Sequence, residues 1–210
     1  MIMRSNLRKF ALTAHITSSV GWLGAVAAFL ALAIVAQTSQ DVPTVRGVYL
    51  AMNLTGWNVV VPLCLATLLT GLVMAFGTKW GLFRYYWVAL KFLLTVISAL
   101  ILFGFTNTLS QMGEFAANAS LSIEDLRNLR QGPAGHSGGG LLVLLAISAL
   151  SVYKPWGRTR YGITHSGMVS ESNPTTGFPL GERWKFYILL AIALMIIAFL
   201  VIHLAQGGGH

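Results

Sequence analysis

Long runs of uncharged, mainly apolar residues dominate this chain. A helix needs roughly 20 apolar residues to cross the hydrocarbon core of a bilayer, and five runs reach that length. The runs are continuous rather than alternating, which favours helices over the strands of a membrane barrel. The sequence therefore predicts an all-α integral membrane protein, a single domain over residues 1–210 built as a bundle of about five transmembrane helices. The expected spans are residues 10–34, 48–77, 86–110, 134–153 and 186–206.

Composition and the distribution of charge agree with this interpretation. Only 10% of the 210 residues are charged and 55% are hydrophobic, whereas soluble domains carry about 25% charged residues. Lys and Arg concentrate before the first run, between the second and third, and between the fourth and fifth. This positive-inside distribution predicts an N-terminus inside and a C-terminus outside (N-in/C-out). We expect a bacterial cytoplasmic (inner) membrane, where the net charge of +8 faces anionic lipids on the cytoplasmic side rather than nucleic acid.

Two shorter features complete the predicted organisation. Ser122 followed by Glu124 and Asp125 resembles a capped helix start, so a short surface helix is expected over Ser122–Arg130. Three glycines at 138–140 open the fourth span, where they favour close packing between helices. The one cysteine, Cys64, lies within the second span, which excludes an intramolecular disulfide.

Polar residues at helical spacing mark the faces that point into the bundle. A polar group inside the membrane costs free energy unless it meets a partner, so such residues are expected at interior faces. The spacing places several of them on one face of each of three helices. These residues are His15, Ser19 and Trp22 in the first span; Asn53, Trp57, Cys64, Thr67 and Gly71 in the second; and Lys91, Thr95 and Ser98 in the third.

The ionisable residues fall into two layers. His15 and Lys91 each lie about five residues from the inner end of a span, roughly 8 Å deep, so they are expected at one level. His136 begins the fourth span and His203 almost ends the fifth, which places both on the outer side. Each layer also has an ordinary explanation. Lys91 can extend its ammonium to the headgroups, and each histidine can simply be hydrogen-bonded within the protein or at the interface.

A functional interpretation of the outer layer uses the chemistry of imidazole. Two histidines from facing helices can hold one haem, and bundles commonly build cofactor sites from inward side chains. We therefore predict that His136 and His203 face one another as metal ligands, with His15 a further candidate. Glycines would leave room for the macrocycle, amides would orient the rings, and arginines would pair with the propionates. These supporting residues are Gly139, Gly140, Asn53, Asn107, Arg127 and Arg130.

Short motifs in the first three spans resemble a known superfamily. They are His15 followed by Trp22-Leu-Gly24, then Leu69-Thr70-Gly71-Leu72, then Trp87 followed by Lys91. This order resembles the membrane proteins that include the copper-resistance-D-like proteins and the HemJ-type protoporphyrinogen oxidases. A closer resemblance, to a group of uncharacterised bacterial integral membrane proteins, covers nearly the whole chain and includes Leu150–Pro155.

The HemJ-type resemblance implies a bound haem b, with His15 and Lys91 at the matching functional positions. That type has a histidine just before its third-helix lysine, where this chain has Ala89 and Leu90, so the resemblance does not establish the oxidase reaction. The copper-resistance-like resemblance implies copper handling, although no Met- or His-rich outer segment is present.

Two classes of function remain open from sequence. One is a protein that holds haem b or a related tetrapyrrole for redox chemistry or haem handling, with a redox partner or a quinone as a further partner. The other is a cofactor-free structural or accessory membrane protein, and copper handling is a third alternative. The residues do not identify an enzymatic reaction or decide whether the chain forms a homo-oligomer.

The charge distribution generates a topological prediction. Tags at Ser5 and within residues 166–178 should report the cytoplasm, and a tag after His210 should report the outside, because Lys and Arg are retained on the inner side. Reporter fusions at these positions measure this directly. A cytoplasmic C-terminus would contradict a bundle of five spans.

Overall fold

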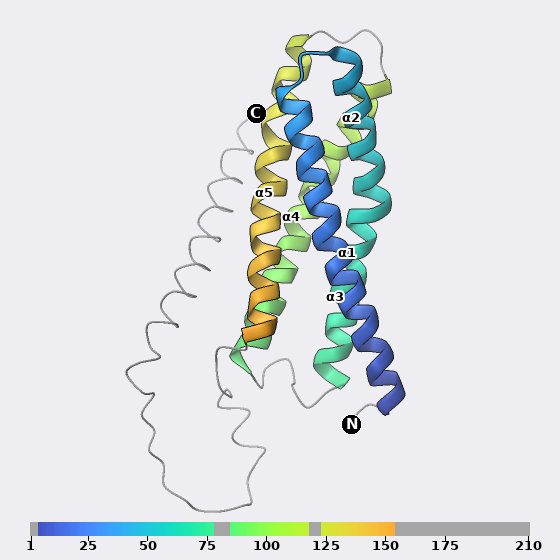
Figure 1. The fold of residues 1–210 in the computed structure, drawn as a ribbon, viewed down its shortest axis with the longest axis vertical. Coiled ribbons are helices and arrows are strands. Elements are labelled where there is room, and N and C mark those ends of the chain that lie inside the picture. Colours follow the sequence, from blue (N-terminus) through green and yellow to red (C-terminus); the bar gives the residue numbers. More distant parts are fainter. Residues whose placement is uncertain (1–3, 78–84, 118–122, 154–210) are drawn as a thin grey trace, which may run out of the picture.

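Long helices account for almost all of the described chain (Figure 1). The computed structural model describes residues 4–77, 85–117 and 123–153. The helices are α1 (Ser5–Thr38), α2 (Val42–Thr55), a π-helical turn η1 (Gly56–Val60), α3 (Val61–Gly77), α4 (Tyr86–Ala117) and α5 (Ile123–Tyr153). Because α2, η1 and α3 follow without a break, they form one continuous span over Val42–Gly77.

Four helices in this part of the chain are long and apolar enough to cross a membrane. They are α1, the span Val42–Gly77, α4, and the segment Gly132–Tyr153 of α5. The predicted all-α class is therefore confirmed, and a helix able to cross a membrane lies over each of the first four predicted spans. The fifth predicted span, residues 186–206, lies outside the described residues, as does the basic loop before it.

The boundary of the fourth span differs from the expectation. Residues 123–130 are helical as predicted, but they continue into α5 instead of forming a separate surface helix. Pro133 lies inside this helix and lacks the N–H that would bond to the carbonyl four residues before it. The Ser137 hydroxyl donates a hydrogen bond to the Pro133 carbonyl at 2.7 Å.

The four spans form a ring in which α1 and α4 lie opposite each other, and each packs against both the second span and α5. The helix α1 packs against α2, α3 and α5, and α4 also packs against α2, α3 and α5. Figure 1 shows α5 beside α1, with α4 behind them. A short turn joins α1 to α2. Asp41 in this turn caps the start of α2 by accepting a hydrogen bond from the Thr44 backbone N–H at 3.0 Å. Hydrogen bonds from Thr44 lower the pKa of this exposed carboxyl.

Apolar side chains cover both the inside and the outside of this ring. The inward face of α1 carries buried residues three or four positions apart, including Trp22, Val26 and Phe29, as an amphipathic pattern requires. The outward faces are also apolar, since Phe10 is 73% exposed and Leu100 is 65% exposed. Contiguous exposed apolar surface is unfavourable in water but matches the hydrocarbon of a bilayer.

Two glycines allow the second span and α4 to approach closely. A Cβ atom added at Gly56 would lie 2.7 Å from Leu109 Cδ1, and one added at Gly113 would lie 2.8 Å from Asn53 Cγ. Asn53 Nδ2 donates a hydrogen bond to the Leu109 carbonyl at 2.6 Å across the same interface. Small residues of this kind let membrane helices gain packing contacts and interhelical hydrogen bonds.

The inward face of the second span differs from the predicted one at Trp57. This side chain was expected to share a face with Asn53 and Cys64, but it is 43% exposed. The buried positions nearby are Met52, Gly56 and Val60. Successive helical residues are rotated by about 100°, so a face centred on Gly56 turns Trp57 outward.

The close α2–α4 contact generates a stability prediction. Gly113→Ala should lower the free energy of unfolding by about 1–2 kcal/mol, because the new methyl displaces Asn53 from its bond to the Leu109 carbonyl. Gly104→Ala on the same helix is the matched control, because a Cβ there meets nothing within 4 Å. The control should be neutral or up to about 1 kcal/mol more stable. Equal stability of the two variants in a detergent unfolding assay would contradict the proposed contact.

Candidate functional site

A cluster of polar residues surrounds His15 where α1 packs against α3. The His15 Nδ1 atom lies 3.0 Å from the Thr70 hydroxyl oxygen. A Cβ added at Gly71 would lie 3.2 Å from His15 Cε1, so the imidazole packs directly on the α3 backbone. The histidine of the first motif and the Thr-Gly pair of the second therefore meet in space. We call His15, Thr70, Gly71 and Lys91 the His15 cluster.

The hydrogen bonds of Thr70 indicate which nitrogen of His15 carries the proton. The Thr70 hydroxyl donates its single hydrogen to the Ala66 carbonyl at 2.6 Å. Its oxygen then accepts from His15, which favours the hydrogen on Nδ1, and the Thr67 carbonyl is a further acceptor for the imidazole. In the neutral imidazole the lone pair then lies on Nε2, the arrangement typical of metal-ligating histidines whose other nitrogen is held by the protein.

Lys91 on α4 completes the His15 cluster. Its ammonium is close enough to His15 for a charge interaction between them. The same ammonium lies over the Trp87 ring, with Nζ 5.0 Å from the ring centroid. A cation over an indole face is a favourable contact. The ammonium therefore contacts an aromatic ring and lies within electrostatic range of the imidazole.

The second described histidine, His136, lies on α5 toward the opposite end of the bundle. Its Nδ1 is 2.9 Å from the Gly132 carbonyl, and because a carbonyl only accepts, Nδ1 carries the hydrogen here too. The imidazole stacks on Phe105 of α4 with ring centroids 4.9 Å apart. Asn53 contacts α4 rather than this histidine, and Asn107 is exposed on α4. His203 lies outside the described residues, so its pairing with His136 stays a prediction.

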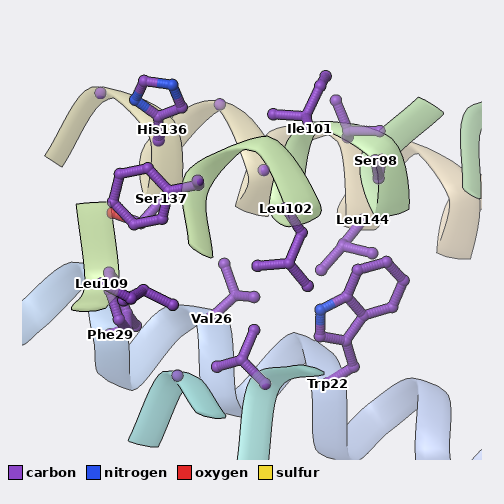
Figure 2. Close-up of a pocket in the computed structure, with 17 residues that line it drawn as sticks. Trp22, Val26, Phe29, Ser98, Ile101, Leu102, Leu109, His136, Ser137 and Leu144 are labelled. Carbon is purple, nitrogen blue, oxygen red and sulfur yellow. The ribbon is translucent and has the colours of Figure 1, made fainter. Parts of the chain in front are cut away.

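A cavity of about 90 Å³ lies inside the bundle next to His136. It is bounded by α1, η1, α4 and α5, and Figure 2 shows His136 at one edge with Trp22 across the cavity from it. Apolar side chains and glycines make up most of the wall. The lining residues are Trp22, Val26, Phe29, Gly56, Val60, Ser98, Ile101, Leu102, Phe105, Leu109, Gly135, His136, Ser137, Gly139, Gly140, Val143 and Leu144.

One polar atom in the cavity wall has no hydrogen-bond partner among the described residues. Trp22 is only 3% exposed, and its indole Nε1 is buried without an acceptor. Leaving such a donor unpaired costs about 1–3 kcal/mol. Ser98 and Ser137 also line the cavity, but their hydroxyls donate to the carbonyls of their own helices. The sequence pattern placed Trp22 on an interior stripe but could not show that its N–H lacks an acceptor.

The residues predicted from sequence thus separate into three places. His15 and Lys91 come together, His136 borders the cavity, and Asn53 joins the α2–α4 interface. Within residues 4–77, 85–117 and 123–153, no group of three or more His, Cys, Asp or Glu could hold a metal ion. Sequence reasoning missed Thr70 as the partner of His15 and Phe105 as the partner of His136. Both contacts join different helices and depend on how those helices pack.

Fold and site together define the class of protein. Four apolar helices with lipid-facing side chains and a partly polar interior make this chain a multi-pass membrane protein. No protein-family model, curated protein or solved structure is significantly similar to it.

The His15–Thr70 contact generates a second prediction. Thr70→Val should lower the free energy of unfolding by about 1 kcal/mol, as expected for a hydrogen bond between membrane helices, because it removes the acceptor of the His15 Nδ1–H. Thr106→Val is the matched control, since this hydroxyl bonds only to its own helix on an exposed face. Nitrogen chemical shifts of His15 should change in the first variant alone. An unchanged tautomer signature in Thr70→Val would contradict the assignment.

Proposed function

We propose that this multi-pass membrane protein binds haem b, or a related tetrapyrrole, with His15 as an axial ligand. The observation that supports the proposal most strongly is the hydrogen bond from His15 Nδ1 to Thr70. It fixes the ring and leaves Nε2 as the donor atom for a metal, as second-shell partners do for metal-ligating histidines. The resemblance of the His15, Thr70-Gly71 and Lys91 motifs to the HemJ type points to the same positions.

The surroundings of His15 also fit the periphery of a haem. The macrocycle carries anionic propionates, and the ammonium of Lys91 near His15 would pair with one of them. The imidazole is only partly buried, which allows a large planar group to approach it. When bound, the haem would supply a redox-active iron. The protein would supply an oriented ligand, a counter-charge and a site that limits contact with water.

The outer site at His136 is the weaker of the two positions for a tetrapyrrole. Its imidazole has a suitable tautomer, but the adjacent cavity of about 90 Å³ is smaller than the roughly 150 Å³ that accommodate one benzene. A four-pyrrole macrocycle would need the helices there to separate. Copper is also less well supported, because copper(I) favours sulfur ligands and Met112 is buried in the apolar core.

A cofactor-free accessory role is the second candidate, and one observation favours it. Both described histidines already have a hydrogen-bond partner within the protein, at Thr70 and at Gly132. Such bonds would satisfy each imidazole without any ligand. The two candidates differ in whether Nε2 of His15 binds iron.

Absorption spectroscopy of the purified full chain, expressed with added haem, tests the proposal. The wild-type protein should show a Soret band, and His15→Ala should lose it because the axial ligand is removed. Lys91→Met should keep the ligand but lower haem occupancy several-fold, since the propionate partner is gone. His165→Ala, at a position without an assigned role, should leave the spectrum unchanged.

Other results of the same experiment would reject the His15 site. A colourless wild-type protein would favour the cofactor-free role. A Soret band that survives His15→Ala but is lost in the double variant His136→Ala, His203→Ala would move the haem to the predicted outer site.

A further inference from the structure

The interior cavity suggests a binding site that does not depend on haem. We propose that it binds the carbonyl-bearing edge of the ring of a flat, uncharged, lipid-soluble molecule of the quinone class, and that the Trp22 indole N–H donates a hydrogen bond to the carbonyl oxygen. The unpaired Trp22 N–H, the chemistry of the cavity wall and the position of the cavity in the membrane support this inference independently.

The hydrogen-bonding groups of the cavity wall favour a ligand that carries a hydrogen-bond acceptor. The indole N–H of Trp22 is a donor only, it is buried, and it has no acceptor among the described residues. Figure 2 shows the Trp22 indole at the cavity, with its nitrogen on the side of Val26 and Leu102. The hydroxyl hydrogens of Ser98 and Ser137 are already donated to backbone carbonyls at 2.8 and 2.7 Å. A ligand oxygen that accepts from Trp22 would therefore satisfy the one buried side-chain donor that lacks a partner among the described residues of the wall.

The rest of the wall specifies an uncharged and largely apolar ligand. No Lys, Arg, Asp or Glu is among the lining residues, and His136 lies at the edge. A charged group placed there would lose its hydration without gaining a counter-ion. The rings of Trp22, Phe29 and Phe105 offer aromatic surfaces, which favour contact with a planar ring.

The size of the cavity and its position in the bundle further limit the kinds of molecule that could bind there. The cavity of about 90 Å³ is smaller than the roughly 150 Å³ that accommodate one benzene, so it would take only the carbonyl-bearing edge of a ring, and the rest of the molecule would lie in its open side. It lies within the apolar spans, so a ligand would enter from the bilayer rather than from water. Lipid-soluble carbonyl compounds with one compact ring, such as membrane quinones, meet all of these requirements. Water is the competing occupant, because it can also accept a hydrogen bond from an indole.

A pair of ligands and a pair of variants test the hydrogen bond. Duroquinone is a single fully substituted ring with two carbonyls, and durene is the same methylated ring without them. Binding of each is measured by titration calorimetry on the full chain in lipid nanodiscs, using wild type, Trp22→Phe and Trp57→Phe. Trp57 is the matched control because it is 43% exposed on the outside of the bundle.

We expect the protein to prefer duroquinone over durene, and we expect this preference to depend on Trp22 but not on Trp57. The ratio of the durene Kd to the duroquinone Kd should be roughly three- to tenfold smaller in Trp22→Phe than in wild type, as expected for one neutral hydrogen bond. Trp57→Phe should leave the ratio unchanged. Comparing ratios between variants removes the different partitioning of the two molecules into lipid. An unchanged ratio in Trp22→Phe, or no saturable duroquinone binding to wild type, would overturn the proposal and leave water as the occupant.

A second pair of variants tests the location. Gly140 lines the cavity, and a Cβ there would be 3.9 Å from Val26 Cγ1, an ordinary contact, so Gly140→Leu should fill the cavity and abolish duroquinone binding. Gly24→Leu is the control, because a Cβ at this exposed position meets nothing within 4 Å. Helical content by circular dichroism confirms folding of both variants. Undiminished binding to a folded Gly140→Leu protein would place the ligand elsewhere. The haem proposal is tested separately, because it would be rejected by a missing Soret band and not by the loss of duroquinone binding.

Discussion

The bundle depends on how closely its helices can approach, because a bilayer provides little hydrophobic driving force between them. Lipid tails are as apolar as the side chains that would replace them, so packing contacts and interhelical hydrogen bonds must hold the spans together. The structure combines both at two interfaces. Gly71 admits the His15 ring beside its bond to Thr70, and Gly113 admits Asn53 beside its bond to the Leu109 carbonyl.

The glycines of α5 have a different consequence from those of the tight interfaces. A Cβ at Gly138 or Gly140 would meet α1 only at 3.9 Å, an ordinary contact distance. These glycines were expected to bring helices close together, yet the tightest approaches lie at Gly56 and Gly113 instead. Gly139 and Gly140 line the cavity, so the missing side chains contribute to open space rather than to a close interface.

The two described histidines occupy separate environments that cannot share one metal ion. Gly138 lies near Leu30 and Gly140 near Val26, so α1 and α5 run antiparallel. His15 is eleven residues below Val26, and His136 is four residues beyond Gly140 in the other direction. At 1.5 Å per residue the two imidazoles are separated by roughly 20 Å along the bundle. The His15 cluster and the cavity beside His136 are therefore separate places, and a ligand proposed at one would not exclude a ligand at the other.

The sequence by itself determined the all-helical class and the existence of four long apolar helices, because both follow from local composition and a fixed rise per residue. It also identified the motif residues that meet around His15, without showing how they meet. Only the tertiary structure decided the outward rotation of Trp57, the Thr70 partner of His15 and the unpaired N–H of Trp22. These features depend on distances of a few ångströms between residues far apart in the chain. Helical periodicity gives the direction of a side chain around its own axis, but not the rotation and approach of the neighbouring helix that decide what it contacts.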